Sequence, residues 1–296
     1  MAAITVQLAD YKVNTKPTWC PGCGDYAVLT GVTRALVGAG KQPHEVAVVS
    51  GIGCSSNLPH FLKAYGIHSL HGRALPVAQG IKLANPDLTV IATGGDGDGY
   101  GIGSGHFLHA MRRNMDITYV VMNNEIYGLT TGQTSPTSLI GHKTKSTPFG
   151  NIEQPINPVG LALMAGASFV ARGFSGDAKG LAELIQKGVE HKGFSFIDVQ
   201  SPCVTYNKLN TYDWFRERVY NLQEKGHDKE DFSAAVARAV EWPTLGPEDK
   251  VPVGVFYETQ KPTYEEGERA YAVGNPAKRK LGITADQRKA LMAELY

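Results

Sequence analysis

Short apolar runs alternate with amphipathic segments along the first part of the chain. Each run is too short for a helix and is typical of a buried parallel strand. The segments between them place apolar residues at helical spacing, and residues 26–40, for example, end in glycines that stop a helix. The alternation predicts an α/β fold, a doubly wound and mostly parallel sheet with helices on both faces. The predicted strands are EVAVVS, LTVIATGG, ITYVVM, ASFVA and FSFIDVQ, and the predicted helices cover residues 26–40, 76–85, 105–114, 157–166 and 178–191.

The pattern weakens beyond Tyr206, where the sequence becomes mixed and charged. We still predict a strand at residues 251–258 and a closing helix at residues 284–296 with Thr284 as its cap. The chain is therefore divided into a domain at residues 1–205 and a C-terminal extension at residues 206–296. We expect the extension to wrap around the domain or to contact a partner.

The composition narrows the class of protein. The chain has 296 residues, of which 19% are charged and 42% hydrophobic, with a formal net charge of +1, as is ordinary for a soluble globular protein. Lysine and arginine form no cluster of the kind that binds nucleic acid. The first residues lack a charged segment followed by an apolar run, and no apolar stretch approaches the ~20 residues of a membrane helix. We expect a cytoplasmic protein that binds neither nucleic acid nor membrane, with cysteines that are free, catalytic or metal-bound.

Four unusual segments each follow a predicted strand. They are GIGCSS, GGDGDGYG, NNEIYGLT and SPC. The carboxyl ends of parallel strands meet at one edge of a sheet, and that edge is where doubly wound folds bind ligands. The sequence therefore predicts one composite site, with Cys54 and Cys203 on the same edge.

The glycine-rich segment GGDGDGYG combines close backbone approach with two carboxylates, Asp96 and Asp98. The G-x-G-x-x-G register fails here, and the chain contains no G-x-x-x-x-G-K-[ST]. Carboxylates repel a bare phosphate, whereas Mg²⁺ can bridge carboxylate and phosphate oxygens. Asn124 follows Asp96 by 28 residues, one crossover later, and supplies a second oxygen ligand on the adjacent strand. The alternative is that Asn123 and Asn124 only cap a turn.

Half of the four cysteines lie in one C-x-x-C, at Cys20 and Cys23. Such a dithiol is a redox pair, two zinc ligands or two iron-sulfur ligands. A thioredoxin-like pair is disfavoured because no strand precedes it. Four thiols suit either Zn²⁺ or a cubane cluster, and their spacing leaves both open.

Together these motifs resemble the β subunit of 2-oxoacid:ferredoxin oxidoreductases. The G-D-G and N-N pair resembles the thiamine-diphosphate fingerprint, and WCPGCG, GIGCSS, HGRALPVAQGIKLANP and YGLTTGQTSPTS occur in the family's order between about Thr18 and Cys203. The resemblance implies Mg²⁺ held by Asp96, Asn124 and the carbonyl of Ile126. It also implies a [4Fe-4S] cluster held by Cys20, Cys23, Cys54 and Cys203.

The resemblance further implies a set of residues around thiamine diphosphate, without assigning a catalytic residue. His71 is of interest because it precedes a glycine turn that opens a helix, where backbone N–H groups meet phosphate. The implied cofactor contacts are Ile52, Gly53, Cys54, Ser55, His71, Gly72, Arg73, Ala74, Gly97, Asp98, Gly128 and Leu129.

The implied reaction is oxidative decarboxylation of a 2-oxoacid to acyl-CoA and CO₂, with electrons passing through the cluster to ferredoxin. An α subunit would supply the pyrimidine-side glutamate, so we expect the chain to be inactive alone and to form an αβ, (αβ)₂ or four-subunit assembly. Two other classes remain, a non-redox thiamine enzyme without need of four cysteines and a zinc-stabilised binding protein.

The choice of substrate is weakly encoded. Some members of this family carry a lysine in place of Thr131, which would suit a distal carboxylate, and its absence leaves pyruvate, 2-oxoglutarate and a broad range open. Residues 139–155 are either a mobile flap or a solvated surface loop.

Overall fold

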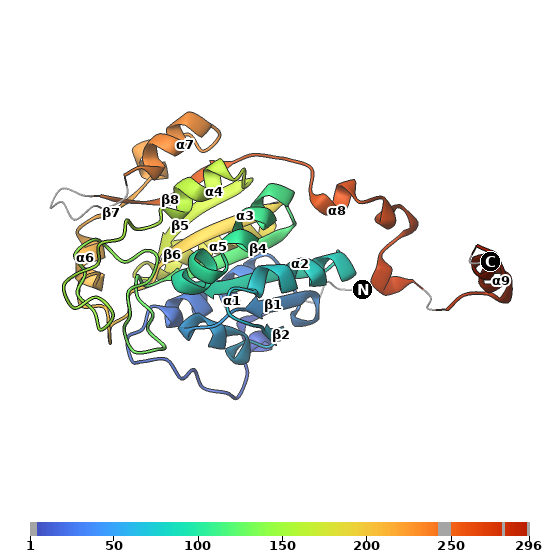
Figure 1. Cartoon of the computed structure of the whole chain (residues 1–296), viewed down its shortest axis with the longest axis horizontal. Helices are drawn as coiled ribbons and strands as arrows, with labels where there is room; N and C mark the ends of the chain where they lie inside the picture. The colour runs from blue at the N-terminus through green and yellow to red at the C-terminus, as the bar shows by residue number, and fades with distance from the viewer. Residues whose placement is uncertain (1–4, 242–249, 280–281, 295–296) are drawn as a thin grey trace.

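A computed structural model describes residues 5–241, 250–279 and 282–294, which form an eight-stranded sheet flanked by helices (Figure 1). The strand order is β2-β1-β3-β4-β6-β5-β8-β7. All neighbouring strands are parallel except β5 and β8. The strands are β1 (Val46–Ser50), β2 (Tyr65–His68), β3 (Thr89–Gly95), β4 (Ile117–Asn123), β5 (Phe169–Phe174), β6 (Phe194–Gln200), β7 (Val219–Asn221) and β8 (Val251–Glu258).

Helices cover both faces of the sheet, which confirms the predicted doubly wound α/β fold. On one face, α1 and α5 contribute valine, leucine and isoleucine side chains to a single core cluster. On the other face, α2, α3, α4 and α7 build a second cluster around aromatic residues such as Phe107 and Phe196. The bounds are α1 (Asp25–Gly38), α2 (Ala74–Ala84), α3 (Ser104–Arg113), α4 (Pro158–Met164), α5 (Ala178–Glu190), α6 (Tyr212–Arg216), α7 (Phe232–Ala239), α8 (Tyr264–Gly267) and α9 (Ala285–Ala293).

The predicted strands and helices of the domain occur where the sequence pattern indicated them. The helix expected from Pro76 begins two residues earlier, at Ala74. The strand predicted at residues 251–258 is β8, and it pairs antiparallel with β5. The Thr284 hydroxyl caps α9 as predicted, by accepting a hydrogen bond from the backbone N–H of Gln287 at 3.1 Å. Residues 295–296 of that predicted helix lie outside the described residues.

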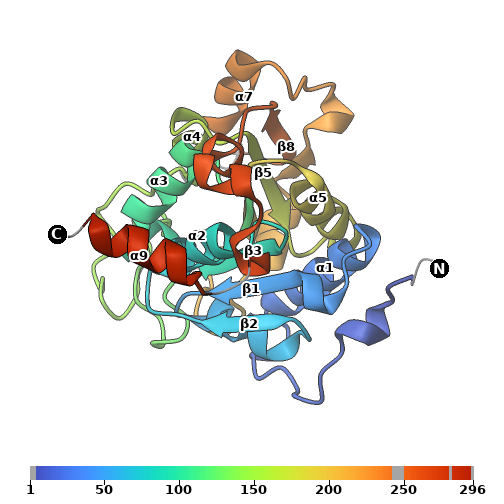
Figure 2. The same ribbon diagram turned by 90° about the vertical axis from the view of Figure 1, so that its right-hand side faces the viewer.

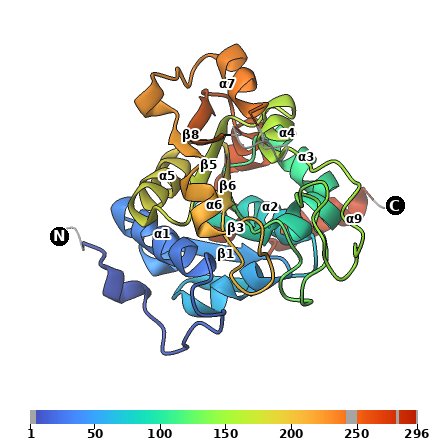
Figure 3. The same ribbon diagram turned by 90° about the vertical axis from the view of Figure 1, so that its left-hand side faces the viewer.

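The two edges of the sheet carry different parts of the chain. Figure 3 faces the carboxyl edge, where α6 and the long connection after β4 lie over the strand ends. Figure 2 faces the amino edge, where the segment after β8 crosses in front of the sheet. None of the described helices is long and apolar enough to span a bilayer.

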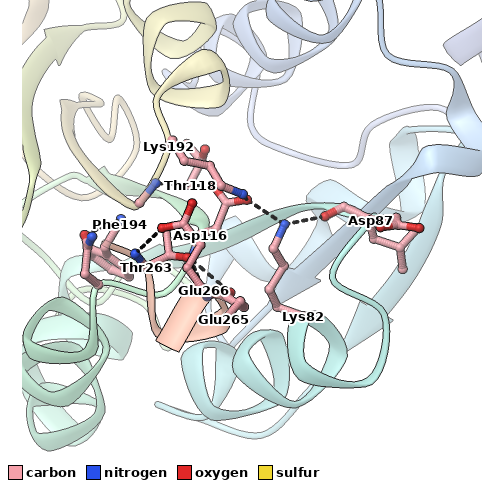
Figure 4. Close-up of polar contacts among 12 residues, drawn as sticks. Lys82, Asp87, Asp116, Thr118, Lys192, Phe194, Thr263, Glu265 and Glu266 are labelled. Atoms are coloured by element: carbon pink, nitrogen blue, oxygen red, sulfur yellow. Dashed lines mark hydrogen bonds and ion pairs between the residues drawn. The ribbon is translucent and has the colours of Figure 1, made fainter. Parts of the chain in front are cut away.

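Polar contacts attach the segment after β8 to the amino edge, as Figure 4 shows for its first part. We call Lys82, Asp116, Lys192 and Glu265 the amino-edge cluster. The Asp116 Oδ2 atom lies 2.7 Å from Lys82 Nζ and 2.9 Å from Lys192 Nζ. The backbone N–H of Asp116 donates to Glu265 Oε1 at 3.1 Å.

Further along this segment, two contacts reach the end of α2 and the turn that follows it. The Tyr271 hydroxyl donates to the carbonyl of Leu83 at 2.5 Å, and Lys278 pairs with Asp87 at 2.5 Å. In α9, by contrast, every described residue is exposed. The chain is thus fixed along the amino edge up to about residue 278, and α9 projects from it (Figure 1).

Candidate functional site

One cavity at the carboxyl edge brings together most of the residues that the sequence predicted around a cofactor. Of the predicted cofactor contacts, Gly72, Arg73 and Ala74 are not among its described lining, although Gly72 touches a lining residue. The predicted residues that line it are Ile52, Gly53, Cys54, Ser55, His71, Asp96, Gly97, Asp98, Asn124, Ile126, Gly128 and Leu129.

Asp96 and Asn124 lie side by side because β3 and β4 are adjacent parallel strands. Asp96 is 2% exposed, and its Oδ2 atom accepts hydrogen bonds from the hydroxyls of Ser135, at 2.5 Å, and Thr137, at 2.6 Å. Burial raises the pKa of Asp96 to about 6, and the two hydroxyls oppose that shift. The Asn124 Oδ1 atom accepts from the backbone N–H of Ile126 at 3.1 Å, which folds Asn124 and Ile126, two of the three predicted ligands, into one turn.

Asp98 links two loops that border the cavity. Its Oδ1 atom accepts three hydrogen bonds, from the backbone N–H of Ile52 at 2.8 Å, from the backbone N–H of Gly72 at 2.7 Å and from the Nδ1 atom of His71 at 2.8 Å. Because Nδ1 of His71 is engaged, its Nε2 atom is the nitrogen left for other partners. The side chain of His71 is 38% exposed and lines the cavity. Asp98 therefore lines the cavity and holds together the two loops that border it.

Close packing explains why glycine occupies two positions of the site. A Cβ atom on Gly97 would lie 2.0 Å from Cε1 of Tyr127, and one on Gly51 would lie 1.9 Å from Oδ2 of Asp98. Any larger residue at either position would displace the side chains that shape the cavity.

All four cysteines line a second cavity of about 260 Å³. This thiol cavity adjoins the cofactor cavity, and Cys54, Asn124, Gly128 and Leu129 line both. A Cβ atom on Gly128 would lie 3.5 Å from the Sγ atoms of both Cys54 and Cys203, so these thiols converge on one glycine. No three His, Cys, Asp or Glu side chains of the described residues come close enough to hold a single metal ion.

Asp25 is a site residue that the sequence did not single out. It begins α1 directly after the C-x-x-C-G, is 1% exposed, and lines the cofactor cavity close to Cys23. Its Oδ1 atom accepts from the hydroxyl of Ser201 at 2.9 Å, and burial raises the pKa of Asp25 to about 6. Burial, together with the carboxylate of Asp25, raises the pKa of the Cys54 thiol to about 12. An acid immediately after the dithiol was the signal available in the sequence.

Further lining and anchoring residues come from the segment after β4. Tyr127 and Thr130 line the cavity, while Ser135 and Thr137 hold Asp96. The sequence placed this segment near a substrate but gave no sign that its hydroxyls reach back to the acidic loop, because that contact depends on how the chain turns after Asn124.

The comparisons with known proteins agree with the observed fold. Residues 44–199 match the family described as thiamine pyrophosphate enzyme, C-terminal TPP binding domain, and residues 203–272 match the family of the C-terminal part of the pyruvate ferredoxin oxidoreductase beta subunit. The fold and the family match over residues 44–199 thus define a thiamine-diphosphate-binding domain. The chain belongs to the family of β subunits of 2-oxoacid:ferredoxin oxidoreductases, which confirms the family and the multi-subunit oxidoreductase predicted from the motifs.

Three similar proteins illustrate the relationship. The 2-oxoacid:ferredoxin oxidoreductase subunit beta of Saccharolobus solfataricus is 48% identical over 261 residues, which cover 84% of each chain. The 2-oxoglutarate synthase subunit KorB of Archaeoglobus fulgidus is 42% identical over 221 residues, covering 74% of this chain and 82% of that protein. A solved structure, the 2-oxoglutarate:ferredoxin oxidoreductase from Magnetococcus marinus with 2-oxoglutarate, coenzyme A and succinyl-CoA bound, superimposes with a TM-score of 0.88 at 42% identity. It covers 97% of this chain and 96% of that chain.

Proposed function

We propose that this β subunit takes part in the oxidative decarboxylation of 2-oxoacids to acyl-CoA and CO₂, with electrons passing through a [4Fe-4S] cluster to ferredoxin. One observation carries the proposal: the cofactor cavity and the thiol cavity share a wall that includes Cys54 and Gly128. A redox centre held by the thiols would therefore lie next to the thiamine chemistry. A non-redox thiamine enzyme has no need of this second cavity.

The residues of the cofactor cavity fit Mg²⁺ and a diphosphate. Asp96, Asn124 and the carbonyl of Ile126 offer hard oxygen ligands, which Mg²⁺ prefers. The hydroxyls of Ser135 and Thr137 fix the carboxylate of Asp96, as outer partners of metal ligands commonly do. Thiamine diphosphate, when bound, supplies the sink for the electrons that loss of CO₂ leaves behind.

The chain's own contribution is to position these groups and to shape the cavity. Asp98 ties the Ile52 loop to the His71–Gly72 loop, because its Oδ1 atom accepts a hydrogen bond from the backbone N–H of Ile52 and of Gly72. The Asn207 side chain donates to the carbonyl of Asn124 at 3.0 Å and fixes the start of the turn that carries the metal ligands. The closeness of Tyr127 to Gly97 restricts the remaining volume.

The four thiols suit a cubane cluster. Zn²⁺ would draw sulfur atoms to about 2.3 Å from one point. A [4Fe-4S] cluster binds one cysteine at each of four iron corners and so suits thiols spread around a larger cavity. Cys20, Cys23, Cys54 and Cys203 are free and line the cavity of about 260 Å³.

Exposed apolar side chains near the cofactor cavity support the docking of an α subunit there. Leu129 lines the cavity and is 53% exposed, and Leu70 and Ile102 are exposed at 74% and 55%. Leu70 directly precedes His71, and the carbonyl of Ile102 contacts Arg73. We propose that this area is covered by the α subunit, which also supplies the pyrimidine-side glutamate. The αβ, (αβ)₂ or four-subunit stoichiometry and a cytoplasmic location stay predictions.

The test is to purify the chain anaerobically with its α subunit. The complex should be brown, contain iron and sulfide, and reduce ferredoxin in the presence of a 2-oxoacid and coenzyme A. Cys203→Ser should bleach the colour and abolish ferredoxin reduction while the variant still binds thiamine diphosphate with Mg²⁺. A colourless complex that contains zinc would contradict the electron-transfer proposal.

A further inference from the structure

Two loops meet at the rim of the cofactor cavity. The first is a tight turn after β4, in which Tyr127 and Gln133 form an antiparallel bridge. Leu129 and Thr130 at the tip of this turn line the cavity. The next residue, Thr131, has a φ of 74°, a left-handed conformation that costs a non-glycine residue about 1–2 kcal/mol. Such conformations in β-branched residues cluster where function constrains the backbone.

The second loop covers residues 139–151 and is pinned to the first. The Ser146 hydroxyl accepts from the backbone N–H of Thr134 at 3.1 Å and shares a second hydrogen bond with its side chain at 3.0 Å. The base of the loop is closed by backbone hydrogen bonds from Gly141 to Asn151, at 2.7 Å, and from Asn151 to His142, at 3.0 Å. These contacts give the tip of the loop a defined place beside the cavity.

Lys145 lies at that tip and points toward the strained residue. Its ammonium donates a hydrogen bond to the hydroxyl of Thr131 at 2.9 Å. No carboxylate in the described part of the chain forms an ion pair with this ammonium. A cation is therefore held at the rim with two of its three N–H groups left for an anion.

A substrate with two negative charges would need a cation that the described lining of the cavity does not supply. Among the described residues that line it, three are aspartates and none is lysine or arginine. Mg²⁺ on Asp96 and Asn124 would serve the diphosphate of the cofactor. A second carboxylate on the substrate, away from the reacting keto group, would have no positive partner within the cavity and would be directed toward the rim.

We infer that Lys145 selects dicarboxylic 2-oxoacids, by pairing its ammonium with the carboxylate distal to the keto group. This inference rests on the proposed function and names the substrate class of the same site. A monocarboxylic 2-oxoacid such as pyruvate makes no contact with Lys145, so the lysine discriminates between the two classes without taking part in the chemistry.

The test compares 2-oxoglutarate with pyruvate in the purified complex of this chain and its α subunit. Lys145→Met removes the charge at similar volume and should raise the KM for 2-oxoglutarate by about tenfold or more, the loss expected for one charge-assisted hydrogen bond. The kinetics with pyruvate and the KM for coenzyme A should stay unchanged. Lys145→Arg should retain most of the preference, and Lys143→Met, which alters an exposed lysine of the same loop, is the matched control.

A non-reacting probe separates binding from turnover. Glutarate carries the distal carboxylate without a keto group, so it should inhibit the unmodified complex and lose this effect in Lys145→Met, whereas inhibition by butyrate should not change.

Equal losses with both substrates, or no loss, would overturn the inference, and so would a rise in the KM for coenzyme A alone, which would assign the ammonium to coenzyme A. An unmodified complex that oxidises pyruvate but not 2-oxoglutarate would overturn the inference and leave the proposed function standing. A complex that oxidises no 2-oxoacid would overturn the proposed function itself.

Discussion

Carboxyl groups at the carboxyl edge and at the amino edge of this sheet differ in whether their oxygens have hydrogen-bond or ion-pair partners. At the carboxyl edge, Oδ2 of Asp98 and both oxygens of Glu125 are buried without a hydrogen-bond partner in the described part of the protein. At the amino edge, the Asp116 carboxylate forms ion pairs with Lys82 and Lys192, and its backbone N–H donates a hydrogen bond to Glu265. Buried polar groups are normally satisfied, so the unpartnered oxygens of Asp98 and Glu125 set these two carboxyl groups apart from Asp116.

Two carboxyl groups show how far the edges differ. Burial, with Asp96 and Asp198 nearby, raises the pKa of Glu125 well above its ordinary value, and Arg172 opposes this only in part. For Asp116, burial alone would raise the pKa, but Lys82 and Lys192 outweigh it and hold the pKa below its ordinary value. The same kind of group therefore has its pKa raised at one edge and lowered at the other.

The largest expected effect lies at the carboxyl edge. Asp96→Ala should abolish decarboxylation in the complex, because it removes a proposed ligand of Mg²⁺.

Thr137→Val removes only a hydrogen-bond partner of Asp96. It should weaken the Mg²⁺-dependent binding of thiamine diphosphate by about 10–100-fold, and Asp96→Ala should weaken this binding further. Calorimetric titration and turnover measure both, and the colour of the cluster should remain. Asp87→Ala at the amino edge is the control, and activity surviving in Asp96→Ala would refute the magnesium assignment.

At the amino edge, Asp116→Asn should lower stability and leave activity intact. The change leaves the buried ammonium of Lys82 without its carboxylate. The expected loss is about 2–3 kcal/mol, below the about 3–5 kcal/mol of a fully buried pair, because Lys192 is exposed. Chemical denaturation measures the free energy of unfolding. An unchanged stability would mean that the amino-edge cluster does not hold the segment after β8 in place.

The pH dependence of the stability of Asp116→Asn tests whether folding lowers the pKa of Asp116. A depressed pKa contributes stability that is present above the unfolded value of about 3.9 and is lost as pH falls through the folded pKa of Asp116. Asp116→Asn should therefore flatten the acid side of the stability profile. An acid side as steep as in the unmodified chain would show that other carboxylates cause it.

Glu125→Gln should have the opposite effect and stabilise the cofactor-free chain. A raised pKa contributes stability that is complete below the unfolded value of about 4.3 and is lost as pH rises toward the folded pKa of Glu125. Glutamine has nearly the same shape and no proton to retain, so the gain near neutral pH should be about 1–3 kcal/mol. Unfolding at several pH values measures it. A variant that is less stable than the unmodified chain at alkaline pH would contradict a raised pKa of Glu125.

The smallest expected effect is that of Tyr271→Phe. It removes one half-buried hydrogen bond to the carbonyl of Leu83, worth about 0.5–1.5 kcal/mol. The change should speed hydrogen exchange in residues 268–279 without altering global unfolding or activity. An equal change in exchange across the carboxyl edge would show that the two edges are coupled rather than independent.

The fold was predictable from the sequence wherever burial imposes a pattern. Strands β1, β3, β4, β5 and β6 are buried on both faces and therefore read as short apolar runs. By contrast, every residue of β2 is exposed, so no apolar pattern marked this strand. The short helix α7 was missed for a related reason, because only Ala235 and Ala239 of it are buried.

The site was predictable where its residues follow a strand directly, as Asp96 and Asn124 do. Contacts made by loops over long sequence separations were not, because they depend on three-dimensional turns. Ser135 reaches Asp96 from 39 residues away, and Lys145 reaches Thr131 across a loop without regular structure. The roles of the predicted metal, cluster and cofactor residues stay predictions until the variants above are measured.

The direction of β8 has a practical consequence. It is antiparallel to β5, so the chain enters it near the carboxyl edge and leaves it at the amino edge. A parallel strand in its place would have released the following segment at the carboxyl edge, where the cofactor cavity lies. Because the exit lies at the opposite edge, we expect an affinity tag or fluorescent reporter fused after the C-terminal helix to stay clear of the cofactor cavity, whereas the same insertion directly after β6 would lie on the cavity's edge of the sheet.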